Sequence, residues 1–162
     1  RNGDDRLRFH LVRPEETVRA GDVAVTAVQS NHKIDKAHMI AEEQTLNYVF
    51  EQSGKTIFYG LDSSFILPRT LEILSQFRFD LAVLDATFGD LDIDREGSGH
   101  QDFTMVEETI AELREAEIVT DQTRVLGSHI SVRHVAPHDD IATEVSSRRG
   151  FELAYDGMTV GV

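Results

Sequence analysis

The chain has 162 residues, which is enough for one domain with a hydrophobic core, and 40% of them are hydrophobic. Acidic residues outnumber Lys and Arg by 29 to 16, and the formal net charge of −13 disfavours nucleic acid and anionic membranes as partners. The chain has no cysteine, so disulfides and thiolate metal sites are excluded and any metal must be held by His, Asp and Glu.

No apolar run is long enough for a membrane span, and the N-terminal residues do not resemble a signal peptide. A cytoplasmic location is therefore expected. The sequence starts at Arg1 rather than at methionine, which suggests a fragment or a processed product.

The first part of the chain is predicted to consist mainly of β-strands. Residues 1–6 are polar and are expected to fray. Alternating apolar residues, and two runs separated by a Gly-containing segment at 51–54, are typical of strands and of a hairpin. On this basis strands are predicted at residues 7–11, 23–27, 45–50 and 55–60, with a turn at 20–22 and a loop or single helical turn at 33–44.

The second part alternates helices with strands, which predicts an α/β fold. Thr104 and Glu107 are spaced as a capping box at the start of one amphipathic helix. Helices are predicted from Pro68, over 104–116 and from Pro137; strands at 81–84 and 123–127; a long acidic loop at 88–100; and a terminal hairpin over 151–155 and 158–162.

The stretch from Lys55 to Ser64 organises the prediction of function. Its apolar run predicts a central strand covered on both faces, which ends at Gly60, with Asp62 just past its carboxyl end. Ligands of α/β sheets bind outside the carboxyl ends of strands, so Asp62 is a candidate site residue. The alternative is a turn or helix N-cap residue, supported by the serines that follow.

Four predicted strand-to-loop junctions end in side chains that can bind a metal or a proton. They are His32, Asp62, Asp85 with the loop to His100, and His129. Imidazoles and carboxylates together suit zinc, manganese or iron. Taken singly, His32 could be a loop histidine, His129 could bond a backbone carbonyl, and His100 could be merely solvated. The remaining histidines, to which no role is assigned, are His10, His38, His134 and His138.

From Val23 to Val162, the sequence contains in order the motifs V-x-x-N-H, YGLDSS, LAVLDATFGD…GH, RVLGSHIS and AYDGMTV. In the order of these motifs, the sequence resembles the metallo-β-lactamase superfamily. More narrowly, it is similar to the PhnP-type cyclic phosphodiesterases. The resemblance implies that His32 binds one metal ion, that Asp62 bridges two, and that His129 binds the other. It also implies that Asp85 is a supporting carboxylate and that His100 is the general acid for the leaving oxygen.

The cofactor implied is a pair of divalent ions, zinc or manganese with iron as a further candidate, and the implied substrate is a small-molecule phosphodiester or related ester. RNA 3′-processing endonucleases share the resemblance, but the charge of −13 without a basic patch disfavours tRNA. A lactonase or thioesterase of the same fold is an alternative, and a non-catalytic structural or binding domain is another.

The H-x-H-x-D-H run that opens the family pattern is absent from this sequence. The chain is therefore expected to be the C-terminal ββα half of an αββα sandwich, in class α/β (α+β), with an incomplete or empty metal site. The parent protein is expected to be a metal-dependent hydrolase, and this chain alone to be inactive. A lone half would expose an apolar sheet face, so self-association or a partner that supplies the missing half is expected.

Overall fold

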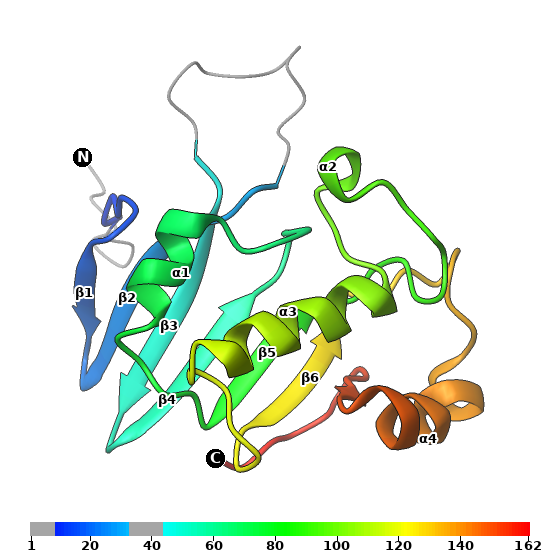
Figure 1. The fold of residues 1–162 in the computed structure, drawn as a ribbon. Coiled ribbons are helices and arrows are strands. Elements are labelled where there is room, and N and C mark those ends of the chain that lie inside the picture. The colour runs from blue at the N-terminus through cyan, green and yellow to red at the C-terminus, as the bar shows by residue number, and fades with distance from the viewer. Residues whose placement is uncertain (1–8, 33–43) are drawn as a thin grey trace, which may run out of the picture.

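A computed structural model describes residues 9–32 and 44–162, in which seven strands form one mixed sheet (Figure 1). The strands are in sequence order across the sheet. They are β1 (Thr17–Ala20), β2 (Val23–Gln29), β3 (Leu46–Gln52), β4 (Lys55–Gly60), β5 (Leu81–Asp85), β6 (Arg124–Ser128) and β7 (Glu152–Leu153). The described helices are α1 (Pro68–Leu74), α2 (Arg95–Ser98), α3 (Phe103–Glu115) and α4 (His138–Arg149).

The sheet changes direction of pairing at β4. Strands β1 to β4 are antiparallel neighbours, whereas β4 to β7 are parallel. The parallel strands are connected through α1, α3 and α4, because a parallel pair needs a crossover. The carboxyl ends of β4, β5 and β6 therefore meet at one edge of the sheet, as their register shows by pairing Gly60 with Leu84 and Asp85 with Ser128.

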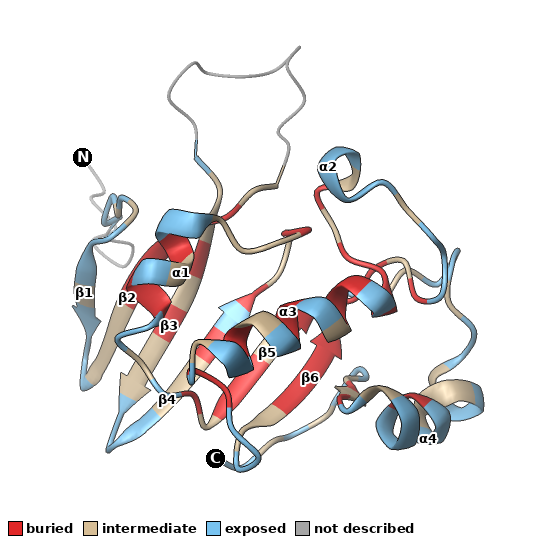
Figure 2. Ribbon diagram, viewed as in Figure 1, coloured by how far each residue is buried: buried red, intermediate tan, exposed pale blue. Residues whose placement is uncertain are grey.

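Helices α1, α3 and α4 pack on one face of this sheet, whereas α2 buries none of its residues. In register across β3 to β6, the buried side chains of Val49, Phe58, Ala82 and Val125 belong to the core together with residues of α1, α3 and α4. Helix α3 turns its buried side toward β5 and β6, as Figure 2 shows. This packing accounts for most of the buried apolar surface that stabilises the fold.

Apolar side chains also lie on the opposite face of the sheet. Their rows follow from the register: Phe50, Ile57 and Leu81 in one, and Tyr48, Tyr59, Val83 and Leu126 in the next. Tyr59 is 44% exposed, and none of these seven residues belongs to the helix-covered core. The expectation that the β4 strand is covered on both faces is therefore wrong for the part of the chain that is described.

Most predicted elements are confirmed, namely the strands at 23–27, 45–50, 55–60, 81–84 and 123–127 and the helices that follow Pro68, residue 103 and Pro137. The strand predicted at 7–11 is wrong where it can be checked, because Phe9 and Leu11 lie outside any strand and Phe9 is 92% exposed. The segment Thr17–Ala20 pairs with β2 instead. The prediction for 33–44 falls almost wholly outside the described residues.

Three details at element ends differ from the sequence prediction. The N-cap of α3 is Asp102, which accepts a hydrogen bond from the Met105 amide at 2.9 Å, so the predicted Thr104–Glu107 capping box is wrong. The long loop contains α2, capped by Asp94. The predicted terminal hairpin is also wrong: β7 pairs in parallel with β6, and residues 158–162 form no strand. Phe151 is buried against Gly127 of β6, and this packing places the residues that follow it beside β6, with which they pair.

None of the described helices combines the length and the apolar character that a membrane crossing requires.

Candidate metal centre

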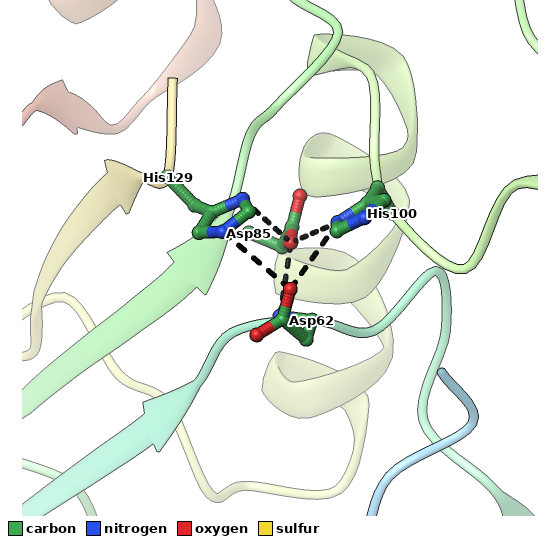
Figure 3. A group of neighbouring side chains, drawn as sticks. All are labelled: Asp62, Asp85, His100 and His129. Carbon is green, nitrogen blue, oxygen red and sulfur yellow. Dashed lines mark hydrogen bonds and ion pairs between the residues drawn. The ribbon is translucent and has the colours of Figure 1, made fainter. Parts of the chain in front are cut away.

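Four predicted site residues meet at the carboxyl edge of the parallel strands. Asp62 follows β4, Asp85 ends β5, His100 precedes α3, and His129 follows β6 (Figure 3). Each offers one nitrogen or oxygen ligand atom, and these atoms all lie within 4.8 Å of one another. Residues up to 67 positions apart in the sequence thus form one cluster because three parallel strands end side by side.

Asp85 is fully buried, and its carboxylate is saturated with hydrogen bonds. Oδ1 accepts from the amides of Thr87 (3.0 Å) and Gln101 (3.1 Å). Oδ2 accepts from the Asp62 amide (3.0 Å) and lies 2.9 Å from His100 Nδ1. Four partners use all the acceptor positions of a carboxylate, so Asp85 orients its neighbours rather than offering a free lone pair to a metal.

Asp62 presents a half-exposed carboxylate to the cluster. Its Oδ1 lies 3.5 Å from His129 Nε2 and 3.7 Å from His100 Nδ1. Helix α1 begins at Pro68 with Leu67 as its N-cap, so the alternative that Asp62 caps this helix is wrong. Its backbone has φ 50°, a left-handed conformation that Asp adopts more readily than most residues.

Hydrogen bonds from the loop after β2 hold the Asp62 loop in place. Asn31 Oδ1 accepts from the Ser63 hydroxyl (2.9 Å) and the Ser64 amide (2.8 Å), and Asn31 Nδ2 donates to Ser64 Oγ (2.9 Å). The Ser30 hydroxyl donates to the Asp62 carbonyl. The sequence prediction missed these roles, since hydrogen bonds between loops that are distant in the chain leave no local pattern.

His100 is held against Asp85 and between two other imidazoles. Its ring stacks on that of His129 with the centroids 5.2 Å apart and 12° between the planes. On another side, the His32 ring meets it edge-on at 4.8 Å. The alternative that His100 is merely solvated is therefore wrong.

His32 lies next to the cluster but is not one of its four members. Its Nδ1 is 3.1 Å from the Gly99 carbonyl oxygen, which can only accept, so Nδ1 carries the hydrogen. Nε2 is left as the nitrogen with a free lone pair. Its role as a metal ligand stays a prediction.

Thr87 is a site residue that the sequence analysis did not identify. Its buried hydroxyl oxygen lies 2.7 Å from His129 Nδ1 and donates to the His129 carbonyl oxygen at 2.9 Å. Thr87 is only two positions after Asp85, in the turn that follows β5, and its amide donates to Asp85 Oδ1 at 3.0 Å.

The two carboxylates of the cluster have no basic side chain as a partner. Within residues 9–32 and 44–162, the only ion-pair partners of Asp62 and Asp85 are His100 and His129. Two carboxylates so close together, one of them fully buried, favour a bound cation.

The arrangement fits a metal ion of the expected type. Two ligands of one tetrahedral ion, with bonds of about 2.0–2.2 Å, lie roughly 3.3–3.6 Å apart. The 3.5 Å between Asp62 Oδ1 and His129 Nε2 agrees with this spacing. Imidazole nitrogen with carboxylate oxygen suits zinc, manganese and iron.

A pocket of about 760 Å³ opens beside His129. Its walls are mainly apolar and include Leu61, Val135, Ile141 and Tyr155. Its volume is in the range of small-molecule sites.

Comparison with known proteins agrees with this geometry. The sequence profile of the beta-lactamase superfamily domain matches residues 1–130. The chain belongs to this superfamily. The family expected from the residue pattern is thereby confirmed, whereas the narrower resemblance to PhnP-type enzymes stays a prediction. No curated protein matches the chain closely enough to be a relative.

Solved structures with the same fold include Zn²⁺-bound PqqB from Methylobacterium extorquens, with 21% identity and a TM-score of 0.67 over 99% of this chain and 57% of that one. A diphosphatase from the PhnP family has 20% identity and a TM-score of 0.63 over 94% and 48%. The metallo-β-lactamase fold protein YhfI from Bacillus subtilis has 16% identity and a TM-score of 0.57 over 88% and 50%. This superfamily chain thus spans about half the length of these proteins.

Proposed function

We propose that this chain is the C-terminal half of a metal-dependent phosphodiesterase and supplies part of a dinuclear centre. The observation that carries the proposal is the pair formed by Asp62 and His129, which face each other at 3.5 Å with no basic side chain beside the carboxylate in the described part of the chain. A cation between them would satisfy both groups.

In the proposed centre, His32, Asp62 and His129 hold two divalent ions, for which zinc, manganese and iron are the candidates. Bound ions of this kind activate water and neutralise phosphoryl oxygens. Asp62 suits the bridging position, since its carboxylate has two oxygens and a half-exposed side chain.

His100 acts in this proposal as the general acid for the leaving oxygen. Asp85 accepts from Nδ1 at 2.9 Å, which fixes the ring and leaves Nε2 as the nitrogen that gives the proton to the leaving group. Asp85 is a positioning residue, because its own carboxylate is saturated.

A small phosphodiester fits the surroundings of the cluster better than a nucleic acid does. The pocket beside His129 has the size of a small-molecule site, and the net charge is −13. One solved structure of the same fold is a diphosphatase. Hydrolysis of a phosphorus ester therefore has more support than the lactonase or thioesterase alternative.

The proposal includes a second sheet layer that covers the apolar face of β3 to β6 and brings the missing H-x-H-x-D-H ligands. The face carries Tyr48, Phe50, Ile57 and Tyr59 without any described helix over it. It belongs to the same strands β4 and β6 that lead into the metal cluster, so a layer packed there ends beside Asp62 and His129. A chain that stays a compact monomer in sedimentation at high concentration, without such a layer, would contradict this part.

The activity test uses bis-p-nitrophenyl phosphate with the chain alone and with the segment of its parent protein that carries the H-x-H-x-D-H run. We expect hydrolysis only after completion and addition of zinc or manganese. In the completed protein, His100→Ala should lower turnover by more than about tenfold while the metal content stays constant. The exposed His10→Ala is the matched control.

Two outcomes decide against parts of the proposal. Equal losses of metal and turnover in His100→Ala would make His100 a ligand. A completed, metal-loaded protein without hydrolytic activity would support the alternative of a non-catalytic structural domain.

A further inference from the structure

We propose that Thr87 is a positioning residue that fixes the tautomer of His129, placing the hydrogen on Nδ1 and leaving the Nε2 lone pair to face Asp62. This inference deepens the proposed function, and its consequence for metal binding rests on it. The tautomer itself does not, because it is set by groups that this chain alone contains.

The assignment follows from counting hydrogens around one hydroxyl. Thr87 Oγ1 has two close partners, the His129 carbonyl oxygen at 2.9 Å and His129 Nδ1 at 2.7 Å. The hydroxyl has one hydrogen, and a carbonyl oxygen can only accept it. If Thr87 donated to Nδ1 instead, two oxygens would face each other at 2.9 Å with no hydrogen between them. Thr87 therefore donates to the carbonyl and accepts from Nδ1–H.

A neutral imidazole with its hydrogen on Nδ1 has its lone pair on Nε2. His129 Nε2 is the nitrogen that lies 3.5 Å from Asp62 Oδ1. Two acceptors then face each other across a gap that fits a cation. With the other tautomer, Nε2–H would point at the carboxylate and no ligand nitrogen would be available there.

Asp85 performs the same task for the neighbouring ring. His100 Nδ1 lies 2.9 Å from Asp85 Oδ2 and only 3.4 Å from Thr87 Oγ1, so its hydrogen belongs to the carboxylate. The two stacked imidazoles are thus oriented by two side chains only two positions apart, Asp85 at the end of β5 and Thr87 in the turn that follows. The neutral Thr87 hydroxyl accepts the hydrogen of His129, and the Asp85 carboxylate accepts that of His100.

The backbone of Thr87 also holds the loop that carries His129. Its carbonyl accepts from the Ser131 amide at 3.1 Å, and the neighbouring Ala86 amide donates to the Ser128 carbonyl at 2.9 Å. These bonds bracket His129, which has φ 63°. They involve only main-chain groups, so both remain in Thr87→Val, which removes only the two bonds that the hydroxyl makes to the His129 ring and carbonyl.

The experiment compares Thr87→Val, which keeps the shape without the hydroxyl, with Thr87→Ser, which keeps the hydroxyl. The ring nitrogens are observed by ¹⁵N NMR in metal-free protein, at a pH where the imidazoles are neutral. The His129 signals are assigned from their loss in His129→Gln. We expect the Nδ1–H pattern for His129 in the wild type and in Thr87→Ser, and the Nε2–H pattern or a mixture in Thr87→Val.

A zinc titration of the same proteins measures the effect of the His129 tautomer on metal affinity. Affinity should fall by about tenfold or more in Thr87→Val and stay within about threefold in Thr87→Ser. An Nε2–H pattern in the wild type, or an unchanged Nδ1–H pattern in Thr87→Val, would overturn the proposal. If the tautomers behave as expected but the wild type binds no zinc, the proposed function fails and the positioning role of Thr87 stands.

Discussion

Strand β5 has an aspartate at each end, and the two carboxylates have opposite surroundings. Asp80, just before the strand, lies 2.9 Å from Lys55 Nζ and accepts from the Thr56 amide at 2.9 Å. Its side chain is 31% exposed. Asp85, the last residue of the strand, is fully buried and is bonded to three amides and an imidazole, with no Lys or Arg partner in the described part of the chain.

The amino end of the parallel strands therefore stabilises the sheet with ordinary ion pairs. Arg124 and Glu152 add another pair there, with two hydrogen bonds of 2.7 and 2.8 Å between β6 and β7. At the carboxyl end, hydrogen bonds occupy all the acceptor positions of the Asp85 carboxylate. The Asp62 carboxylate has no Lys or Arg partner among the described residues. A carboxylate with a basic partner points to a structural role, whereas a cluster without one points to a cation site.

The largest effect on stability is expected at Asp85. In Asp85→Asn, an NH₂ group replaces one carboxylate oxygen, and each oxygen accepts from two donors, so two donors beside this buried side chain lose their acceptor. We expect a loss of about 2–4 kcal/mol in the free energy of unfolding, measured by urea denaturation. A loss below about 1 kcal/mol would show that the buried carboxylate is not a support of the site.

A smaller and pH-dependent effect is expected at Asp80. The hydrogen bond from Lys55, together with that from the Thr56 amide, lowers the pKa of Asp80 in the folded protein. The stabilisation is therefore complete above the carboxyl pKa of the unfolded chain, about 3.9, and is lost as the pH falls through the lower folded pKa.

At neutral pH, Asp80→Asn should cost up to about 1 kcal/mol, because the pair is partly exposed to solvent. Urea denaturation from pH 7 down to pH 2 should show the difference from the wild type shrinking at the acid end. Asp121→Asn, in an exposed turn, is the control. A difference for Asp80→Asn that is equally large at pH 2 would rule out the ionic contribution.

The smallest effect on stability is expected at Asp62. Asn also tolerates the left-handed backbone of φ 50°, and Asp62→Asn removes a negative charge that lies beside Asp85. We expect the metal-free protein to keep its stability or to gain up to about 0.5 kcal/mol. A loss above about 1 kcal/mol in thermal or urea unfolding would assign Asp62 a structural role like that of Asp80.

The sequence predicts the strand-to-loop positions of this site but not the contacts that build it. Apolar runs that end in polar residues predict Asp62, Asp85 and His129 at one edge of the sheet, because parallel strands bring their carboxyl ends together. His100 is predicted with them as part of the loop that follows Asp85, and it lies in the same cluster. Thr87 and Asn31 escaped prediction, since their roles are hydrogen bonds to residues more than 30 positions away.

The fold was predictable to a similar degree. The period of two along β2, the continuous apolar run of β4 and the helical period of α3 mark these elements clearly. The terminal hairpin was mispredicted because a Gly-containing turn between two apolar runs suggests local pairing. In the folded chain, the first of these runs instead pairs in parallel with the edge of β6, where it forms β7.

The contrast between the two ends of the sheet is tested most directly by titrating metal-free protein with zinc and manganese, comparing the wild type with Asp62→Asn and Asp80→Asn. We expect the wild type and Asp80→Asn to bind with equal affinity, and Asp62→Asn to bind at least about tenfold more weakly. Equal binding by all three proteins would contradict the metal site at the carboxyl end of the sheet.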